Sequence, residues 1–391
     1  MVTLNSADSA LKTFYIDAIT EALNMKVNPF LAAVERTSAN VVGKDVKKVV
    51  RVGFNGGVGA GTETGALPTA SQNDYITLSA GLKNLYGTIE ISDKALRAAA
   101  NNEGAFVNLL NDEMQGLIKS ASYNFGRMLF GDGTGELAIV MSHENNRIEV
   151  DTADKIEVGM IVDFYLLEGT KMYGFKVTSV DKENKYITVE IPAEYADLGD
   201  DFEIDPDCPI YLQGSKDNEI FGLEGIFRGR NLLYGVSRDI DCMKPIVKTN
   251  VGELTESKIQ KVIDEIERNT GSKTNFIICS WGVRRALVEL LKKNASGTST
   301  VELAGGHQAI TFNGIPVVVD RFCHEGAMYL LNTDYFKMHQ LCDWQWLEAE
   351  DGKILKQIPG KPVYTATLVK YAELMCENPA AQAKLMGITE A

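Results

Sequence analysis

The sequence has no apolar run long enough to cross a membrane and no excess of positive charge. A membrane-spanning helix needs about 20 apolar residues, and a secretory signal needs a basic segment followed by an apolar one; the sequence has neither. Lys and Arg number 39 against 53 Asp and Glu, a formal net charge of −14. Such a chain has no net attraction for nucleic acid. These absences argue against a membrane protein and a DNA-binding enzyme, but not against a protein that surrounds DNA.

Cysteine and histidine patterns typical of metal sites or catalysis are also missing. None of the six Cys forms C-x-x-C, which indicates reduced thiols in a protein made in a cytosol. Cys323-His324 and His339-x-x-Cys342 could be drawn as a metal site, but closed zinc sites usually space paired ligands by roughly two to four residues. None of the four His belongs to G-x-S-x-G or H-E-x-x-H. We therefore expect no metal, no cofactor and no enzymatic activity.

Glycine, in contrast, clusters between residues 53 and 65. A phosphate-binding Walker loop requires G-x-x-x-x-G-K-[ST], but Thr62 and Glu63 follow Gly61 here. A dinucleotide fingerprint requires a helix that begins at the last glycine, but here Pro68 follows the cluster and no helix start is indicated. The cluster favours a structural loop, and a nucleotide-dependent enzyme is the weaker alternative.

The longest amphipathic pattern covers residues 103–130 and predicts a straight helix lying across a sheet. Asn101 or Asn102 can cap its start, and Gly131 predicts a left-handed stop at its end. Ten apolar residues recur on one face at helical spacing. They are Phe106, Leu109, Leu110, Met114, Leu117, Ile118, Ala121, Phe125, Met128 and Leu129.

A helical start and a long hairpin are expected before this helix. The pattern predicts a helix from Asn5 or Ser6 to about Leu23 and an extended arm over residues 30–43. Residues 46–54 and 75–91 read as two strands flanking the glycine cluster. A hairpin this long and glycine-rich does not build its own core, so we expect it to be either disordered or to lie on another molecule. The candidate contact residues are the basic Lys47, Lys48 and Arg51 and the apolar Phe54, Leu67 and Tyr75.

After residue 135 the pattern changes to short strands separated by polar or glycine turns, which predicts a small closed β-barrel or sandwich. We expect residues 140–214 to fold when expressed alone. The predicted strands are residues 147–150, 160–166, 174–180, 186–191 and 210–212.

From residue 255 onward, helices alternate with strands, and the whole chain is of the α+β class. Thr255 caps a helix that ends at Gly271, and Ser280 caps a second helix. Asn313-Gly314 is a strong hairpin signal between two strands. A long strand is expected over residues 363–376.

Several short motifs stand in a fixed order along this chain. G-D-G-T-G occupies residues 131–135, directly after the long helix, and G-L-E-G-I occupies residues 222–226. F-N-G-I-P-V-V follows at residues 312–318, then Y-A-E-L at 371–374 and N-P-A-A at 378–381. This order resembles the major capsid proteins of tailed bacteriophages, which have the Hong Kong 97-like shell fold. The β-rich stretch between the first two motifs then looks like an insertion, and the resemblance covers most of the chain.

The resemblance implies that many copies assemble as pentamers and hexamers into an icosahedral phage head enclosing double-stranded DNA. The implied partners are further copies of the chain, a separate scaffolding protein, a portal and the packaged DNA, with no membrane. The implied location is the virion capsid, after assembly in the bacterial host cytoplasm. An encapsulin-type nanocompartment shell remains the alternative, although those chains are usually shorter and lack the insertion.

The resemblance also divides the chain into six segments. They are an N-terminal arm (1–44), an extended loop (45–92), a peripheral domain with the spine helix (93–135), an inserted β-barrel-like domain (136–215), an apical domain (216–340), and the return strands and tail of the peripheral domain (341–391).

Overall fold

The structure is a computed structural model, and it describes most of the chain. The expected helix start at Asn5 or Ser6 and the capping Asn101 or Asn102 lie outside the described residues. Within the described part, no helix is both long and apolar enough to span a membrane. The described residues are 16–26, 28–94, 103–166, 169–195, 204–228, 231–293, 300–303 and 306–391.

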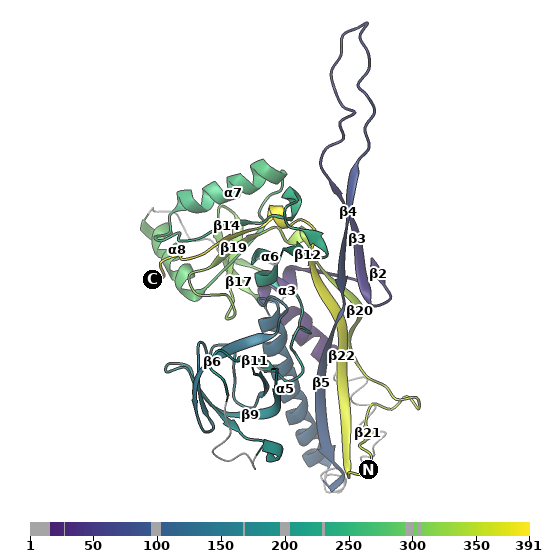
Figure 1. The fold of residues 1–391 in the computed structure, drawn as a ribbon, viewed down its shortest axis with the longest axis vertical. Helices are drawn as coiled ribbons and strands as arrows, with labels where there is room; N and C mark the ends of the chain where they lie inside the picture. The colour runs from purple at the N-terminus through teal and green to yellow at the C-terminus, as the bar shows by residue number, and fades with distance from the viewer. Residues whose placement is uncertain are drawn as a thin grey trace.

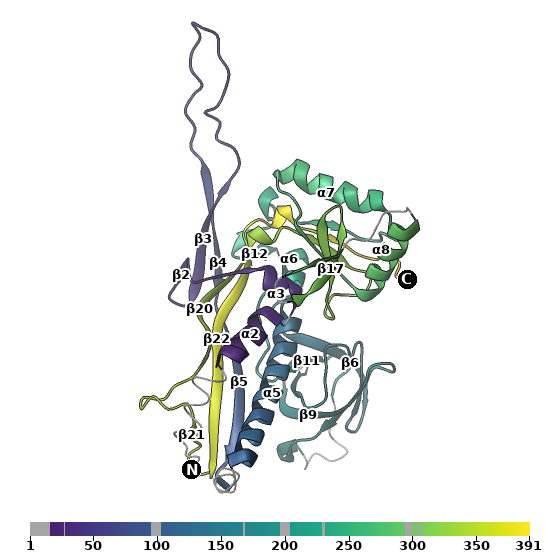
Figure 2. The same cartoon turned by 180° about the vertical axis from the view of Figure 1, so that it is seen from behind.

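The molecule is elongated, with a long sheet and the helix α5 (Glu103–Met128) running side by side. Two lobes lie to one side of this helix and sheet, and a narrow hairpin projects beyond the body (Figure 1). From behind, the short helices α2 (Ile16–Glu21) and α3 (Pro29–Ala33) lie near the upper end of α5 (Figure 2).

Helix α5 is the predicted long helix, and it contacts strand β5 (Lys83–Ser92). A Cβ added at Gly87 would lie 2.8 Å from Leu117 Cδ1, so the missing side chain allows helix and strand to approach closely. The predicted left-handed stop at Gly131 is wrong, because its φ is not positive. The helix ends instead in tight turns, in which the Gly131 N–H donates to Met128 O at 3.0 Å.

The central sheet contains the strand expected at residues 363–376, which is confirmed as β22 (Val363–Cys376). The predicted strand 75–91 is in fact two strands that join different sheets: β4 (Asp74–Gly81) pairs with β3 (Asp45–Val52), whereas β5 pairs with β22. The buried apolar positions shift phase at this point, from Leu78 in β4 to Leu85, Ile89 and Ile91 in β5. A one-residue shift in an alternating pattern turns a strand over, and the prediction of a single strand overlooked it. The other strands of this sheet are β1 (Glu35–Thr37), β20 (Phe336–Trp346) and β21 (Lys356–Gln357).

The N-terminal part is more helical than expected. After α2 the chain forms one π-helical turn, η2 (Ala22–Lys26), and then α3. Asn28 caps α3 by accepting a hydrogen bond from Leu31 N at 2.7 Å, and Pro29 begins the helix. The Asn-Pro pair therefore ends one helix and starts another, so the expectation of an extended arm from residue 30 is wrong for its first residues. Beyond α3 the arm forms β1 and β2 (Val41–Val42).

The β-rich stretch forms a closed barrel with its own apolar core. Five strands were expected there, and the structure adds a sixth, β6 (Glu136–Glu144), which the sequence pattern did not predict. The remaining barrel strands are β7 (Arg147–Val150), β8 (Ile161–Tyr165), β9 (Lys171–Asp181), β10 (Tyr186–Glu190) and β11 (Pro209–Leu212).

The missed strand changes the expected behaviour of an isolated barrel. Leu137 and Ala138 of β6 are buried in the barrel core, and Ala138 lies opposite Ile210 of β11. A fragment of residues 140–214 lacks both core residues, whereas residues 136–215 keep all six strands. We expect the longer fragment to unfold cooperatively on heating, followed by circular dichroism, and the shorter one to melt well below it. Equal melting curves would contradict the importance of the start of β6.

The second lobe has a seven-stranded sheet with helices α7 (Glu256–Thr270) and α8 (Trp281–Lys293). Thr255 caps α7, and Gly271 ends it with φ 69°. Asn313 and Gly314 have φ of 50° and 82°, the conformation of a tight hairpin turn, as predicted. The strands, in sheet order, are β14 (Ile246–Lys248), β23 (Ala383–Leu385), β19 (Met328–Leu331), β15 (Phe276–Cys279), β18 (Ile315–Val319), β17 (Gln308–Phe312) and β16 (Thr300–Glu302). The short elements between the lobes and the tail are α6 (Leu223–Phe227), β12 (Leu232–Leu233), β13 (Val236–Ser237), η4 (Asp241–Met243), η6 (Thr333–Tyr335) and η7 (Pro379–Ala381).

Candidate intersubunit surface

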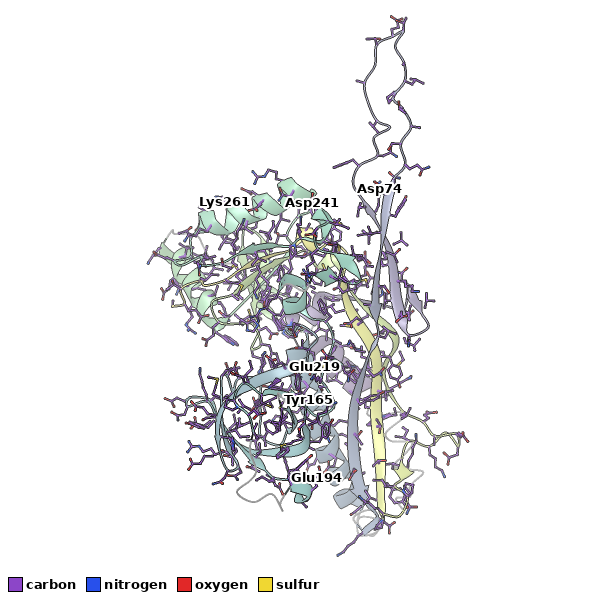
Figure 3. The ribbon with its side chains drawn as sticks, in the orientation of Figure 1. Asp74, Tyr165, Glu194, Glu219, Asp241 and Lys261 are labelled. Carbon is purple, nitrogen blue, oxygen red and sulfur yellow. The ribbon has the colours of Figure 1, made fainter. Side chains whose placement is uncertain are left out.

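The predicted hairpin exists and extends away from the rest of the chain (Figure 1). Strands β3 and β4 pair from Asp45↔Gly81 to Val52↔Asp74, and residues 53–73 beyond them form a long loop without helix or strand. Figure 3 labels Asp74, where the loop returns to β4. Because β2 pairs only with β3, the strand β4 lies at the edge of this small sheet.

Strand alternation divides the four candidate contact residues that lie in β3 and β4 between two faces. Arg51 lies directly opposite Tyr75, and Lys47 is on the same side of β3, so these three side chains share one exposed face. Lys48 lies opposite Leu78, which is fully buried, and so belongs to the face turned toward the body. Lys48 Nζ lies 3.1 Å from Glu377 Oε1, just beyond β22. Within a single chain, Lys48 therefore ties the hairpin to its own body.

The apolar candidates are all strongly exposed large side chains. Relative exposure is 103% for Phe54, 90% for Leu67 and 60% for Tyr75, and Val58 at the tip reaches 86%. Exposed apolar groups that stand together beyond a body mark a contact surface more often than scattered single residues do. These side chains have nothing to cover them within the described part of the chain.

The loop beyond the strands has internal hydrogen bonds. Asn55 Nδ2 donates to Ser71 O at 3.1 Å and to Asn73 Oδ1 at 3.2 Å, while its Oδ1 accepts from Gly57 N at 2.8 Å. One amide side chain thus joins the two sides of the glycine-rich loop at its base. The region around Gly59 and Gly61 opens no helix, so it lacks the geometry of a dinucleotide-binding turn.

The two glycine motifs on either side of the barrel meet in space, as the resemblance implied. Leu223 N donates to Leu129 O at 2.8 Å, and Gly225 N donates to Gly131 O at 3.2 Å. A Cβ at Gly222 would lie only 2.4 Å from Met128 O, so this crossing requires glycine. The two chain segments that connect the barrel to the body therefore lie side by side here, and this crossing is called the neck below.

Buried charges surround the neck, and no sequence pattern had indicated them. Arg127 and Glu219, both nearly inaccessible to solvent, form a two-pronged ion pair, with Arg127 Nη1 2.9 Å from Glu219 Oε2. Glu219 is labelled in Figure 3. These residues stand 92 positions apart, so a local pattern could not pair them.

Glu373 of β22 is buried beside this neck without a cationic partner at hydrogen-bonding distance in the described residues. Its Oε1 accepts from Phe221 N at 2.8 Å and from Leu374 N at 3.0 Å. Burial raises the pKa of Glu373 to about 8, against the smaller opposing effects of these hydrogen bonds and of the Lys83 charge. Lys83 itself donates to Asp217 O at 2.6 Å.

A second buried cation anchors the N-terminal part. Lys370 Nζ is completely buried and lies 2.7 Å from Asp343 Oδ1 and 3.0 Å from Asn24 Oδ1. Asn24 stands in the π-helical turn, and its Nδ2 donates to both oxygens of Asp343. Burial lowers the pKa of Lys370, and Asp343 opposes this effect. These contacts tie the π-helical turn to strands β20 and β22.

The groups considered for metal binding have other partners. His324 Nε2 lies 3.6 Å from Glu224 Oε2, and His339 Nδ1 contacts Ala39 O at 2.9 Å. Burial raises the pKa of the Cys323 thiol well above its usual range, which disfavours the thiolate that a metal requires. Over the described ranges, no group of three or more His, Cys, Asp or Glu side chains is arranged to hold a metal ion.

Comparison with known proteins finds similarity in structure alone. No family model and no curated protein matches the sequence. The capsid of cyanophage A-1(L) matches with a TM-score of 0.55 and 12% identity over 96% of this chain and 93% of that one. The SrpI encapsulin of Synechococcus elongatus has a TM-score of 0.47 at 11% identity (93% and 89% covered), and the capsid of Myoviridae phage XM1 has 0.45 at 10% (91% and 90%). The first of these matches shows that this chain has the fold of a phage capsid shell protein.

Proposed function

We propose that the protein is the structural major capsid protein of a tailed bacteriophage, many copies of which form an icosahedral head around double-stranded DNA. The observation that carries this proposal is the match to a phage capsid along nearly the whole chain. The exposed hairpin supports it, because apolar side chains held beyond the body require a partner surface. The six segments from arm to tail would then be those of the Hong Kong 97-like fold.

The hairpin supplies the contact between copies in this proposal. Arg51, Lys47 and Tyr75 offer one mixed basic and aromatic face, and Phe54 and Leu67 offer apolar anchors farther along. Specific interfaces bury on the order of 1,000 Å² or more, and a projecting hairpin can supply such an area without a larger core. Lys48 is the exception, since its contact with Glu377 serves the subunit itself.

The distribution of charge fits a shell that encloses DNA without binding it. Residues 136–215 contain 18 of the 53 acidic residues but only 6 of the 39 basic ones, so the barrel carries most of the net negative charge. A surface of this sign repels the phosphate backbone and leaves packed DNA free to move. The further partners in this proposal are a scaffolding protein and a portal, with assembly in the bacterial host cytoplasm before the protein resides in the virion.

Electron microscopy of the purified protein tests the proposal. We expect closed particles of uniform diameter from the protein expressed with its scaffolding protein. Particles filled with a cargo protein would favour the encapsulin alternative, and a monomer under every assembly condition would contradict a shell function.

A further inference from the structure

We propose that the turn at Tyr234 is a positioning device that sets the angle at which the hairpin leaves the body before a second copy of the chain binds. The turn lies between β12 and β13, away from the hairpin in sequence but next to the base of β4 in space. This inference rests on the proposed intersubunit role of the hairpin and adds the element that orients it.

The backbone of this turn is in a conformation that costs energy. Tyr234 has φ 51° and Gly235 has φ 78°, both in the left-handed region. Glycine adopts this region freely, but a bulky residue such as tyrosine rarely does so. Strain of this kind persists only where the surrounding structure holds it in place, so the contacts of Tyr234 explain why a tyrosine stands here.

Tyr234 joins the hairpin to the central sheet through opposite ends of the residue. Its backbone oxygen accepts from Ser79 N of β4 at 2.9 Å. Its hydroxyl accepts from Cys376 N at 3.0 Å and donates to Leu374 O at 3.4 Å, both in β22. The ring is buried, with its centroid 5.8 Å from that of Phe221 at the neck.

The Ser79 N–H cannot be bound by β3, the hairpin strand that pairs with β4. Ser79 lies opposite Lys47, and the Lys47 N–H donates away from β4, to Asn40 O at 2.9 Å. In an antiparallel pair, opposite residues either exchange both hydrogen bonds or neither, so the Ser79 N–H points to the outer edge of β4. Thr77 is two residues away, and its N–H points to the same edge.

A hydrogen bond at the base of the hairpin affects the position of residues along the whole hairpin. Asp74, where β4 begins, lies about 17 Å from Ser79 at the usual rise per residue, and the loop extends farther (Figure 3). A small change of angle at Ser79 therefore moves Phe54 and Leu67 by a larger distance. A hairpin already held at its binding angle loses less conformational entropy on association.

Distance measurements between spin labels in the unassembled subunit test the inference. The spin labels are attached to ketone-bearing amino acids that replace Val58 and Lys361. The six native Cys are therefore left unlabelled. We expect the substitution Ser79→Pro, which removes the N–H that Tyr234 binds, to broaden the distance distribution at least twofold. The matched control Thr77→Pro places a proline on the same strand edge, and we expect it to retain the parent distribution.

Tyr234→Phe tests the other end of the connection, because it retains the ring and the backbone oxygen but loses the hydroxyl. We expect a broadened distribution here as well, and Tyr86→Phe, at an exposed site on β5, should cause none. Equal distributions for Ser79→Pro and Thr77→Pro would overturn the inference, as would an unchanged distribution in a folded Tyr234→Phe. Since the unassembled subunit is measured, these outcomes are independent of whether shells form.

Discussion

Replacing residues 55–73 with a short Gly-Ser turn is expected to leave a folded, soluble subunit that no longer closes shells. The change removes the Asn55 bonds across the loop and the exposed Leu67, but no residue of the buried core. Strands β3 and β4 retain their pairing from Asp45 to Val52 and their contacts with the body. Folding should therefore survive while the intersubunit contact is lost, which electron microscopy and sedimentation would show.

The melting temperature for this comparison must be measured in the unassembled state, because assembly itself adds apparent stability. A matched control replaces the exposed loop at residues 182–185 of the barrel with the same Gly-Ser turn, which should leave assembly intact. Regular closed particles from the shortened hairpin would show that the loop is not an intersubunit contact. A subunit that fails to fold would show that the loop serves its own chain.

The second large effect concerns Glu373. Burial raises its carboxyl pKa from an ordinary 4.5 to about 8. At a pH between these two values, the folded protein therefore keeps a proton on Glu373 that the unfolded chain has released. Stability contributed by this group therefore falls as the pH rises from about 4.5 to 8 and stays low above that range. A pKa difference of one between the folded and unfolded states corresponds to about 1.4 kcal/mol, so the full effect is of the order of several kcal/mol.

Glu373→Gln removes the titration and retains an oxygen that accepts from Phe221 N and Leu374 N. We expect the variant to be more stable than the parent at pH 9, by roughly 2 to 5 kcal/mol in denaturant unfolding of the unassembled subunit, and to differ little from it at pH 5. Glu63→Gln, in the exposed loop, should change stability at neither pH. A parent and variant that differ equally at both pH values would show that Glu373 does not titrate in this range.

Local features were predictable because they depend on residues close together in the chain. Thr255 and Gly271 define the ends of α7, Asn313-Gly314 forms its turn, and β22 has the bounds that the sequence predicted. Each of these elements is specified by capping, turn chemistry or apolar spacing within a few residues. The order of such elements was also enough to indicate a capsid fold, which the structural comparison supports.

Three predictions failed because the local sequence pattern was weak or fitted more than one structure. Strand β6 directly follows the G-D-G-T-G stretch, and its Met141-Ser142-His143 segment breaks the expected alternation. The division between β4 and β5 at Leu82 depends on which sheet each half joins, and both halves are equally strand-like. The end of α5 was misjudged because a glycine allows a left-handed stop but does not require one.

The sequence by itself determined α7 with its cap and its glycine stop, the Asn313-Gly314 turn, the strand-rich character of the barrel and the glycine-rich hairpin. Only the tertiary structure decided that Lys48 meets Glu377, that Arg127 meets Glu219, that Glu373 is buried beside the neck and that Tyr234 connects the hairpin to β22. The physical reason is range: caps and turns arise from neighbouring residues, whereas these contacts join residues about 90 to 330 positions apart. Their energies depend on burial, and burial exists only after the chain has folded.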